Sequence, residues 1–214
     1  AHEINNPVQG IMNYADLIGA RAEDSEQVRE FAAEIGNESQ RVATIVRNML
    51  AFSRQERDQE HELVEVRWVI ETTLSLIRTV LRKDEIELVV EIDDALPRIR
   101  CRAQQIQQVI MNLVTNARDA VNEAGANKRI HLRASRHELG LRISVRDQGP
   151  GIPPAIRGRI FDPFFTTKRH DKGTGLGLAV SHGIAVDHGG TLTVESELGV
   201  GSTFNLDLPI DLAG

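Results

Sequence analysis

Residues 104–121 read QQIQQVIMNLVTNARDAV, and this stretch decides how the second part of the chain folds. Its apolar residues recur at helical spacing and predict an amphipathic helix over 103–123. The core stripe of that helix comprises Ile106, Val109, Ile110, Leu113, Ala117 and Val121. Gln108, Asn112 and Asn116 are spaced four apart and share another face. Because Asn lowers helix propensity, this face is either merely solvated or a polar wall whose amide oxygens suit Mg²⁺ or a phosphate-bound cation.

Strands and helices alternate around this helix. The patterns predict helices at 66–81 and 176–188, and strands at 86–92, 130–137, 141–147, 192–196 and 203–208. Residues 149–172 lack periodicity and predict a long loop. Strands whose helices pack on one face predict an α/β sandwich over residues 61–214.

Residues 1–60 read as helix almost throughout and predict a separate domain. One apolar stripe comprises Ile4, Ile11, Tyr14 (or Ala15) and Ile18, and a second comprises Phe31, Ile35, Val42, Ile45, Met49 and Phe52. A turn at 23–26, with a helix cap at Asp24 or Ser25, joins them into an antiparallel hairpin. A single hairpin cannot bury both stripes, so we expect a homodimer with a four-helix bundle, the alternative being packing on the rest of the chain. The charged run 54–62 predicts a hinge, and the fold class is α+β.

Composition narrows the function classes. The chain has 214 residues, of which 41% are hydrophobic and 26% charged, which excludes disorder and collagen-like or disulfide-rich folds. A net charge of −6 argues against a nucleic-acid partner. The single cysteine, Cys101, cannot form an intrachain disulfide and fits a reducing cytoplasm. The longest apolar run is four residues, so we expect no membrane contact. Because Ala1-His2-Glu3 begins in mid-pattern, we expect a cytoplasmic fragment whose upstream part holds any membrane anchor.

Two glycine-rich stretches have the composition of ligand loops. Asp147-Gln148-Gly149-Pro150-Gly151 ends a strand and is either a plain turn or a carboxylate acceptor for an exocyclic amine, with glycines beside a flat base. Residues 173–178, GTGLGL, lead into a helix, where N–H groups and the helix dipole favour a phosphate. Their spacing fits neither a Rossmann fingerprint nor a P-loop. The cations of the preceding loop, among them Lys168, indicate either a mobile lid or an ordinary solvated loop.

The stretch His2-Glu3-Ile4-Asn5-Asn6-Pro7 places a histidine beside a carboxylate. It is not a zinc motif, since Asn6 stands where the second histidine would be. On a helix, Glu3 could accept a proton from one imidazole nitrogen while the other attacks an electrophile. The alternative is an unremarkable surface pair.

Together these segments resemble the two-component sensor histidine kinases. HEINNP is similar to the phosphoacceptor box and NLVTNARDA to the asparagine box, and FDPFFTTK is similar to the phenylalanine box. DQGPGIP and GTGLGLAVSHGI are similar to the two glycine boxes, and GVGSTFNLDLP to the terminal glycine-threonine segment. All six occur in the family's order and cover essentially the whole chain.

The resemblance implies a dimerisation and phosphotransfer hairpin over 1–60 and a Bergerat-type ATP-binding domain over 61–214. It implies His2 as the phosphorylated residue, Glu3 as its general base and Asn6 as the residue that orients water for dephosphorylation of a response regulator. It implies Asn116 as the Mg²⁺ ligand, Asn112 beside the phosphates and Asp147 as the adenine acceptor. The other implied ATP contacts are Gly149, Gly151, Lys168, Gly173, Gly175, Gly177 and Thr203. The implied reaction is ATP-dependent autophosphorylation of histidine and transfer to a receiver aspartate.

Two positions depart from related patterns. ATPases of the gyrase type place a glutamate four residues before the metal-binding Asn, where this chain has Asn112, which cannot activate water. Many family members carry a basic residue where this chain has Asp119, so Arg118 or a lid cation is expected to face the phosphates instead. The remaining alternatives are an ATPase switch of the wider superfamily, which leaves HEINNP unexplained, and a degenerate structural module, which leaves the glycine and asparagine boxes unexplained.

Overall fold

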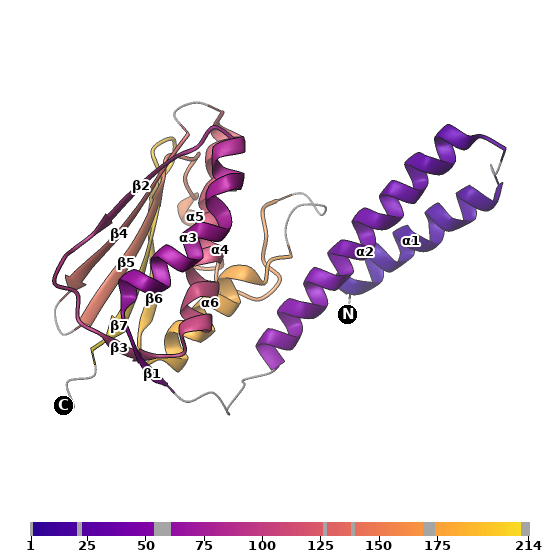
Figure 1. Ribbon diagram of the computed structural model, residues 1–214. Coiled ribbons are helices and arrows are strands. Elements are labelled where there is room, and N and C mark those ends of the chain that lie inside the picture. Colours follow the sequence, from indigo (N-terminus) through magenta and orange to yellow (C-terminus); the bar gives the residue numbers. More distant parts are fainter. Residues whose placement is uncertain are drawn as a thin grey trace. The chain divides into compact units, whose positions relative to one another are not determined.

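The computed structural model describes residues 2–20, 23–53, 61–125, 128–137, 140–168 and 174–210 (Figure 1). It divides into two compact units, one of residues 1–56 with 166–176 and one of residues 57–165 with 177–214. The predicted domain boundary at residue 60 and most of the charged hinge fall in 54–60, outside the described residues. No helix in the described ranges is long and apolar enough to cross a membrane.

The first unit contains a helical hairpin, as predicted. Helix α1 spans His2–Ala20 and helix α2 spans Ser25–Ser53. Asp24 is the cap of α2, because its Oδ1 accepts hydrogen bonds of 3.1 Å from the N–H groups of both Glu26 and Gln27. The rings of Tyr14 and Phe31 stack across the hairpin with their centroids 6.0 Å apart.

Several of the apolar side chains that the structure describes in α1 are not fully buried. Ile11, Tyr14 and Ile18 of α1 are only half-buried. Val8 and Met12 are 40% and 55% exposed. The observation agrees with the argument that one hairpin cannot bury two apolar stripes by itself.

The second unit is built on a five-stranded sheet in the order β2-β4-β5-β7-β6. The strands are β2 (Glu87–Ile92), β4 (Arg129–His137), β5 (Gly140–Asp147), β6 (Thr191–Glu197) and β7 (Gly201–Pro209). Strand β2 runs parallel to β4, and the other neighbours are antiparallel. The α+β fold class and the sandwich are confirmed.

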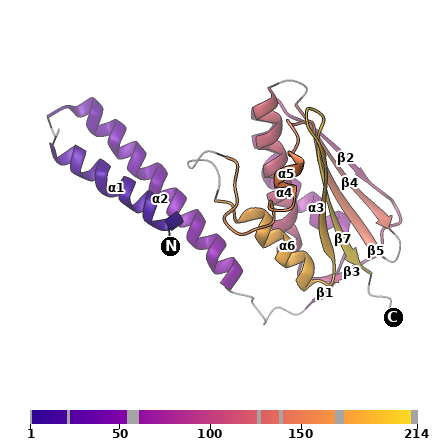
Figure 2. The same cartoon turned by 180° about the vertical axis from the view of Figure 1, so that it is seen from behind.

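Three helices cover one face of this sheet (Figures 1 and 2). They are α3 (Val66–Lys83), α4 (Ala103–Ala124) and α6 (Gly177–Asp187). The predicted stripe of α4 lies in the core, since Ile106, Val109, Ile110 and Leu113 are fully buried. The opposite face of the sheet is polar and includes the ion pair between Arg142 and Asp207. Burying one face of α4 therefore directs its asparagine face away from the core.

A buried histidine fixes the beginning of α4. Nε2 of His188 accepts a hydrogen bond of 3.1 Å from the N–H of Arg102, and its Nδ1 lies 2.8 Å from the carbonyl oxygen of Ile184. Burial is the main reason that the pKa of His188 is lowered, which favours the neutral ring that both contacts require. The end of α6 is thereby joined to the start of α4.

The structure adds elements that the patterns did not predict. Strands β1 (Glu62–Val64) and β3 (Ile99–Cys101) form a separate two-stranded sheet. Helix α5 (Pro154–Arg157) interrupts the region that was predicted as loop. All three are too short to show a period in sequence.

The cap of α2 provides a first test. Replacing Asp24 by Ala removes both side-chain acceptors at the helix start and should destabilise the first turn by about 1 kcal/mol. We expect roughly five-fold faster amide hydrogen exchange at Glu26 and Gln27, measured by NMR. Asp24→Asn is the matched control because Asn caps helices equally well, and equal exchange in both variants would contradict the assignment.

Candidate functional site

Asp147 lies at the end of β5 and is a buried carboxylate, 3% exposed. Its Oδ1 accepts hydrogen bonds from the N–H of Gly149 at 2.8 Å and from the N–H of Ser202 at 3.2 Å. Burial raises the pKa of Asp147, and the two N–H donors oppose that rise. Both hydrogen bonds that the Asp147 side chain accepts from described residues go to Oδ1. Oδ2 is therefore the oxygen that a bound amine would contact.

The glycines after Asp147 are required by the surrounding protein. A Cβ on Gly149 would lie 2.6 Å from the Cβ of Ala120 in α4, and a Cβ on Gly151 would lie 2.1 Å from the carbonyl oxygen of Glu197. Gly151 also has a φ of +75°, which L side chains rarely adopt. The loop is thus held between α4 and the β6–β7 turn, whatever it binds.

The β6–β7 turn supports Asp147 through residues that the sequence did not reveal. Ser196 Oγ accepts from the N–H of Ile152 at 2.7 Å, donates to the carbonyl oxygen of Gly201 at 3.0 Å and lies 2.9 Å from the hydroxyl of Ser202. These contacts join the loop that follows Asp147 to β6 and β7. Serines in two separate strands give no spacing signal, so only the fold could identify them.

Thr203 lies in β7, next to the residue that contacts Asp147. Side chains alternate between the two faces of a strand, and Phe204 and Leu206 of β7 lie in the core under the helices. Thr203 therefore lies on the opposite, polar face, where it pairs with Arg146 and Glu195. Its neighbour Ser202, and not Thr203, contacts Asp147. The expectation that Thr203 lies on the adenine side stays a prediction.

The asparagine face of α4 meets the start of α6. Nδ2 of Asn112 donates to the carbonyl oxygen of Gly177 at 3.2 Å and to Oγ of Ser181 at 3.1 Å. Asn116 follows one turn later and is half-buried. Because both donors of Asn112 are used, its amide oxygen is the part that remains for a ligand.

The donor chemistry of this face fits Mg²⁺. The amide of Asn116 supplies an oxygen, and Mg²⁺ commonly takes only one or two protein ligands together with substrate phosphates and water. No group of three or more His, Cys, Asp or Glu residues suited to a metal occurs in the part of the chain that the structure describes. A metal shared with a nucleotide does not need such a group.

The remaining predicted residues are distributed between the two units. Lys168 and Gly175 belong to 166–176 in the first unit, where the N–H of Lys168 donates to Oγ1 of Thr166 at 3.2 Å and Gly175 has a φ of +65°. Gly173 lies outside the described residues. His2, Glu3 and Asn6 lie within α1, and their side chains are not among those described.

Comparison with known proteins identifies the family. Residues 1–58 match the His Kinase A (phospho-acceptor) domain, and residues 101–212 match the histidine kinase-, DNA gyrase B-, and HSP90-like ATPase family. The chain belongs to the sensor histidine kinases. The match makes the second unit an ATP-binding domain of this family.

Similar kinases match along nearly the whole chain. Sensor histidine kinase ZraS of Escherichia coli K12 is 36% identical over 99% of this chain and 44% of its own length. Signal transduction histidine-protein kinase AtoS of the same strain is 33% identical over 100% of this chain and 34% of its own length. The chain thus spans less than half the length of these relatives.

Solved structures agree with this assignment. Histidine kinase ThkA, in complex with the response regulator protein TrrA, has a TM-score of 0.80 at 31% identity, covering 98% of this chain and 59% of ThkA. Full-length ShkA in complex with AMPPNP has a TM-score of 0.72 at 27% identity, covering 97% of this chain and 44% of ShkA.

Gly201 tests the support of Asp147. It has a φ of +129°, and a Cβ there would lie 2.1 Å from the carbonyl oxygen of Asp147. Gly201→Ala should lower the free energy of unfolding by about 1–3 kcal/mol, the usual range for overpacking, measured by urea denaturation. Gly199→Asn is the control, since Gly199 has a φ of +77°, which Asn tolerates, and open space at its Cβ. Equal stability of the two variants would contradict this packing.

Proposed function

We propose that this chain is the catalytic core of a kinase that transfers the γ-phosphoryl group of ATP to His2 and then to an aspartate of a response-regulator receiver. In this proposal residues 1–60 form the dimerisation and phosphotransfer domain and residues 61–214 bind ATP. The observation that carries it is the amide of Asn112, which donates to α6 at the position where water-activating relatives carry a carboxylate. An amide cannot accept a proton from water, so ATP should persist until a better nucleophile arrives.

The ATP site is proposed on the second unit. Oδ2 of Asp147 accepts from the exocyclic amine of adenine, in an orientation set by the two N–H groups that hold Oδ1. Gly149 and Gly151 frame the base, Asn112 and Gly177 lie beside the phosphates, and Asn116 holds Mg²⁺. The metal, when bound, would neutralise part of the phosphate charge. Lys168, Gly173 and Gly175 are proposed phosphate contacts of the lid.

The transfer step is proposed at the start of α1. One imidazole nitrogen of His2 attacks the γ-phosphorus, the bond to the bridging oxygen breaks, and ADP leaves. Glu3, the next residue, accepts the proton from the other imidazole nitrogen. Catalysis is mostly positioning and charge stabilisation. Phosphohistidine then donates its phosphoryl group to the receiver aspartate. In a separate reaction, Asn6, which lies one helical turn from Glu3, orients the water that removes the phosphoryl group from the receiver.

The proposed partners are a second copy of the chain and a receiver domain. The exposed Val8 and Met12 of α1 and the half-buried stripe of the hairpin support dimerisation through a four-helix bundle. The complex of the similar kinase ThkA with TrrA supports a response-regulator partner. Because ATP and receiver domains are cytoplasmic, we propose that this part of the protein works in the cytoplasm.

The phosphoacceptor can be tested directly. Incubation with γ-labelled ATP should label the wild type with an acid-labile, base-stable phosphate, as expected for phosphohistidine. His2→Gln should abolish the label and leave ATP binding within about two-fold, since His2 lies outside the ATP domain. Label that persists in His2→Gln, or rapid ATP hydrolysis by that variant, would instead favour an ATPase switch.

The role of Asn6 separates the two activities. Asn6→Ala should leave autophosphorylation within about two-fold of wild type and should slow receiver dephosphorylation at least ten-fold, because only the second reaction needs an oriented water. The measurement is release of phosphate from a purified phosphorylated receiver. Asn6→Gln, which keeps the amide at a different reach, is the control for a general helix effect. An equal loss of both activities would contradict the assignment.

A further inference from the structure

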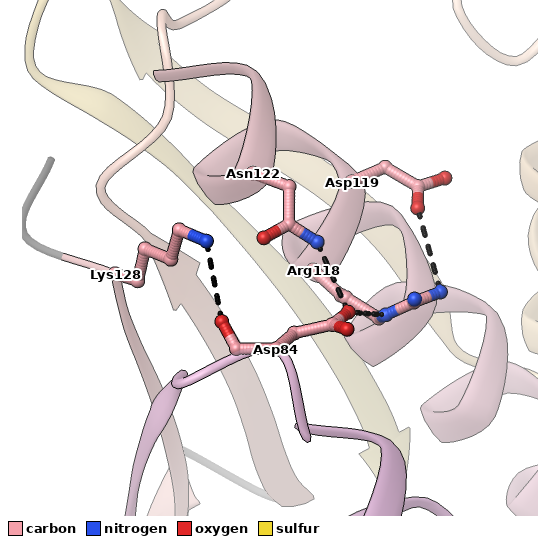
Figure 3. A network of polar contacts seen from close by, with 5 residues as sticks. All are labelled: Asp84, Arg118, Asp119, Asn122 and Lys128. Atoms are coloured by element: carbon pink, nitrogen blue, oxygen red, sulfur yellow. Dashed lines mark hydrogen bonds and ion pairs between the residues drawn. The ribbon is translucent and has the colours of Figure 1, made fainter. Parts of the chain in front are cut away.

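A polar network joins the end of α3 to α4 (Figure 3). Oδ2 of Asp84, the residue after α3, accepts hydrogen bonds from Nε of Arg118 at 2.5 Å and from Nδ2 of Asn122 at 3.1 Å. The carbonyl oxygen of Asp84 accepts from Nζ of Lys128 at 3.2 Å. The hydrogen bond from Arg118 is the main reason that the pKa of Asp84 is lowered. Arg118 is therefore anchored at one end of its guanidinium group.

The other end of the same guanidinium group reaches a second carboxylate. Its Nη1 lies 3.9 Å from Oδ1 of Asp119, and Figure 3 shows Arg118 between the two acidic side chains. The Arg118 and Asp119 side chains are 30% and 33% exposed, so water screens this pair only in part. In the structure the guanidinium group of Arg118 contacts the carboxylates of Asp84 and Asp119. The expectation that Arg118 or a lid cation faces the phosphates stays a prediction.

Asp119 creates an electrostatic problem for a phosphate ligand. It follows Asn116 by three residues and Asn112 by seven, so the three side chains share one helix face. On the proposed function, that face meets the phosphates of ATP. A carboxylate there repels them, and a cation held against it reduces the repulsion.

We propose that Arg118 is a positioning residue for nucleotide binding, which holds and neutralises Asp119 while Asp84 fixes the orientation of its guanidinium group. The inference rests on the proposed function, since it assumes that the phosphates bind along the Asn112–Asn116 face. Arg118 acts without touching the nucleotide. In this proposal the Arg118–Asp119 pair removes a repulsive negative charge from the phosphate face, whereas a single basic residue at position 119 would add a positive charge there.

A purely structural role for Arg118, as a tie between α3 and α4, makes a different prediction. A structural tie acts whether or not residue 119 is charged. A neutralising role disappears once Asp119 is replaced by Asn. A double-mutant cycle therefore separates the two roles.

The test measures the dissociation constant of ADP by calorimetry for the wild type, Arg118→Met, Asp119→Asn and the double variant. We expect Arg118→Met to weaken binding about five- to ten-fold, Asp119→Asn to bind at least as tightly as wild type, and the double variant to match Asp119→Asn. The effect of Arg118→Met should shrink at 0.5 M salt, where screening is strong. Arg142→Met, which loses the ion pair with Asp207 on the polar face of the sheet, is the matched control and should leave ADP binding unchanged.

Each other outcome has a defined meaning. The inference is overturned if Arg118→Met weakens binding equally in both backgrounds, or leaves it unchanged. Arg118→Gln and Arg118→Lys cover the case in which the Met variant fails to fold, and Lys should retain most of the affinity because it keeps the charge. If the wild type itself does not bind ADP, the proposed function fails first and this inference fails with it.

Discussion

The buried carboxylate of Asp147 is the interaction on which the ATP-binding unit depends. Its Oδ1 accepts from Gly149 in its own loop and from Ser202 in β7, so one acceptor joins two segments that are distant in sequence. A buried charge is tolerated only when such donors compensate for lost water. The two donors also orient the second oxygen, because a carboxylate is planar and rigid. The same two hydrogen bonds to Asp147 thus allow its burial, hold the loop that contains Gly149 and fix the orientation of its second oxygen.

Helix α4 supplies the asparagine face beside the loop that contains Asp147 and Gly149. Its apolar stripe is fully buried against the sheet, which leaves a single rotational setting for the asparagine face. Hydrogen bonds tie this helix down at both ends and in the middle, through His188, Asn112 and Asp84. A helix held at three places can present Asn112 and Asn116 with little reorganisation, which a site that works by positioning requires.

Periodic features were predictable from sequence, and features that depend on partners distant in the chain were not. The stripe of α4 was predicted because burial repeats every three or four residues. The sequence predicted that either Asp24 or Ser25 caps α2. The hydrogen bonds in the structure identify Asp24 as the cap. A motif match does not show which face of a strand a residue occupies, so the position of Thr203 on the polar face of β7 could be read only from the structure. The contact of the Ser202 backbone N–H with Asp147 was likewise not visible in the sequence. The Asp84–Arg118 contact joins residues that are 34 apart in sequence, so no repeating pattern in the sequence could predict it.

Asn112 and Asp119 of α4 are the two positions that depart from related sequence patterns. Both affect whether water can attack a bound phosphate. Asn112 removes the carboxylate that stands one turn before the metal-binding Asn in water-activating relatives. Asp119 adds a carboxylate one turn after it, where it could in principle replace the lost base. Its position at the opposite end of the Asn pair, and the contact of its carboxylate with the guanidinium group of Arg118, argue against that. On the proposed function, the helix would hold the nucleotide without activating water, and the phosphoryl group would remain available for the imidazole of His2.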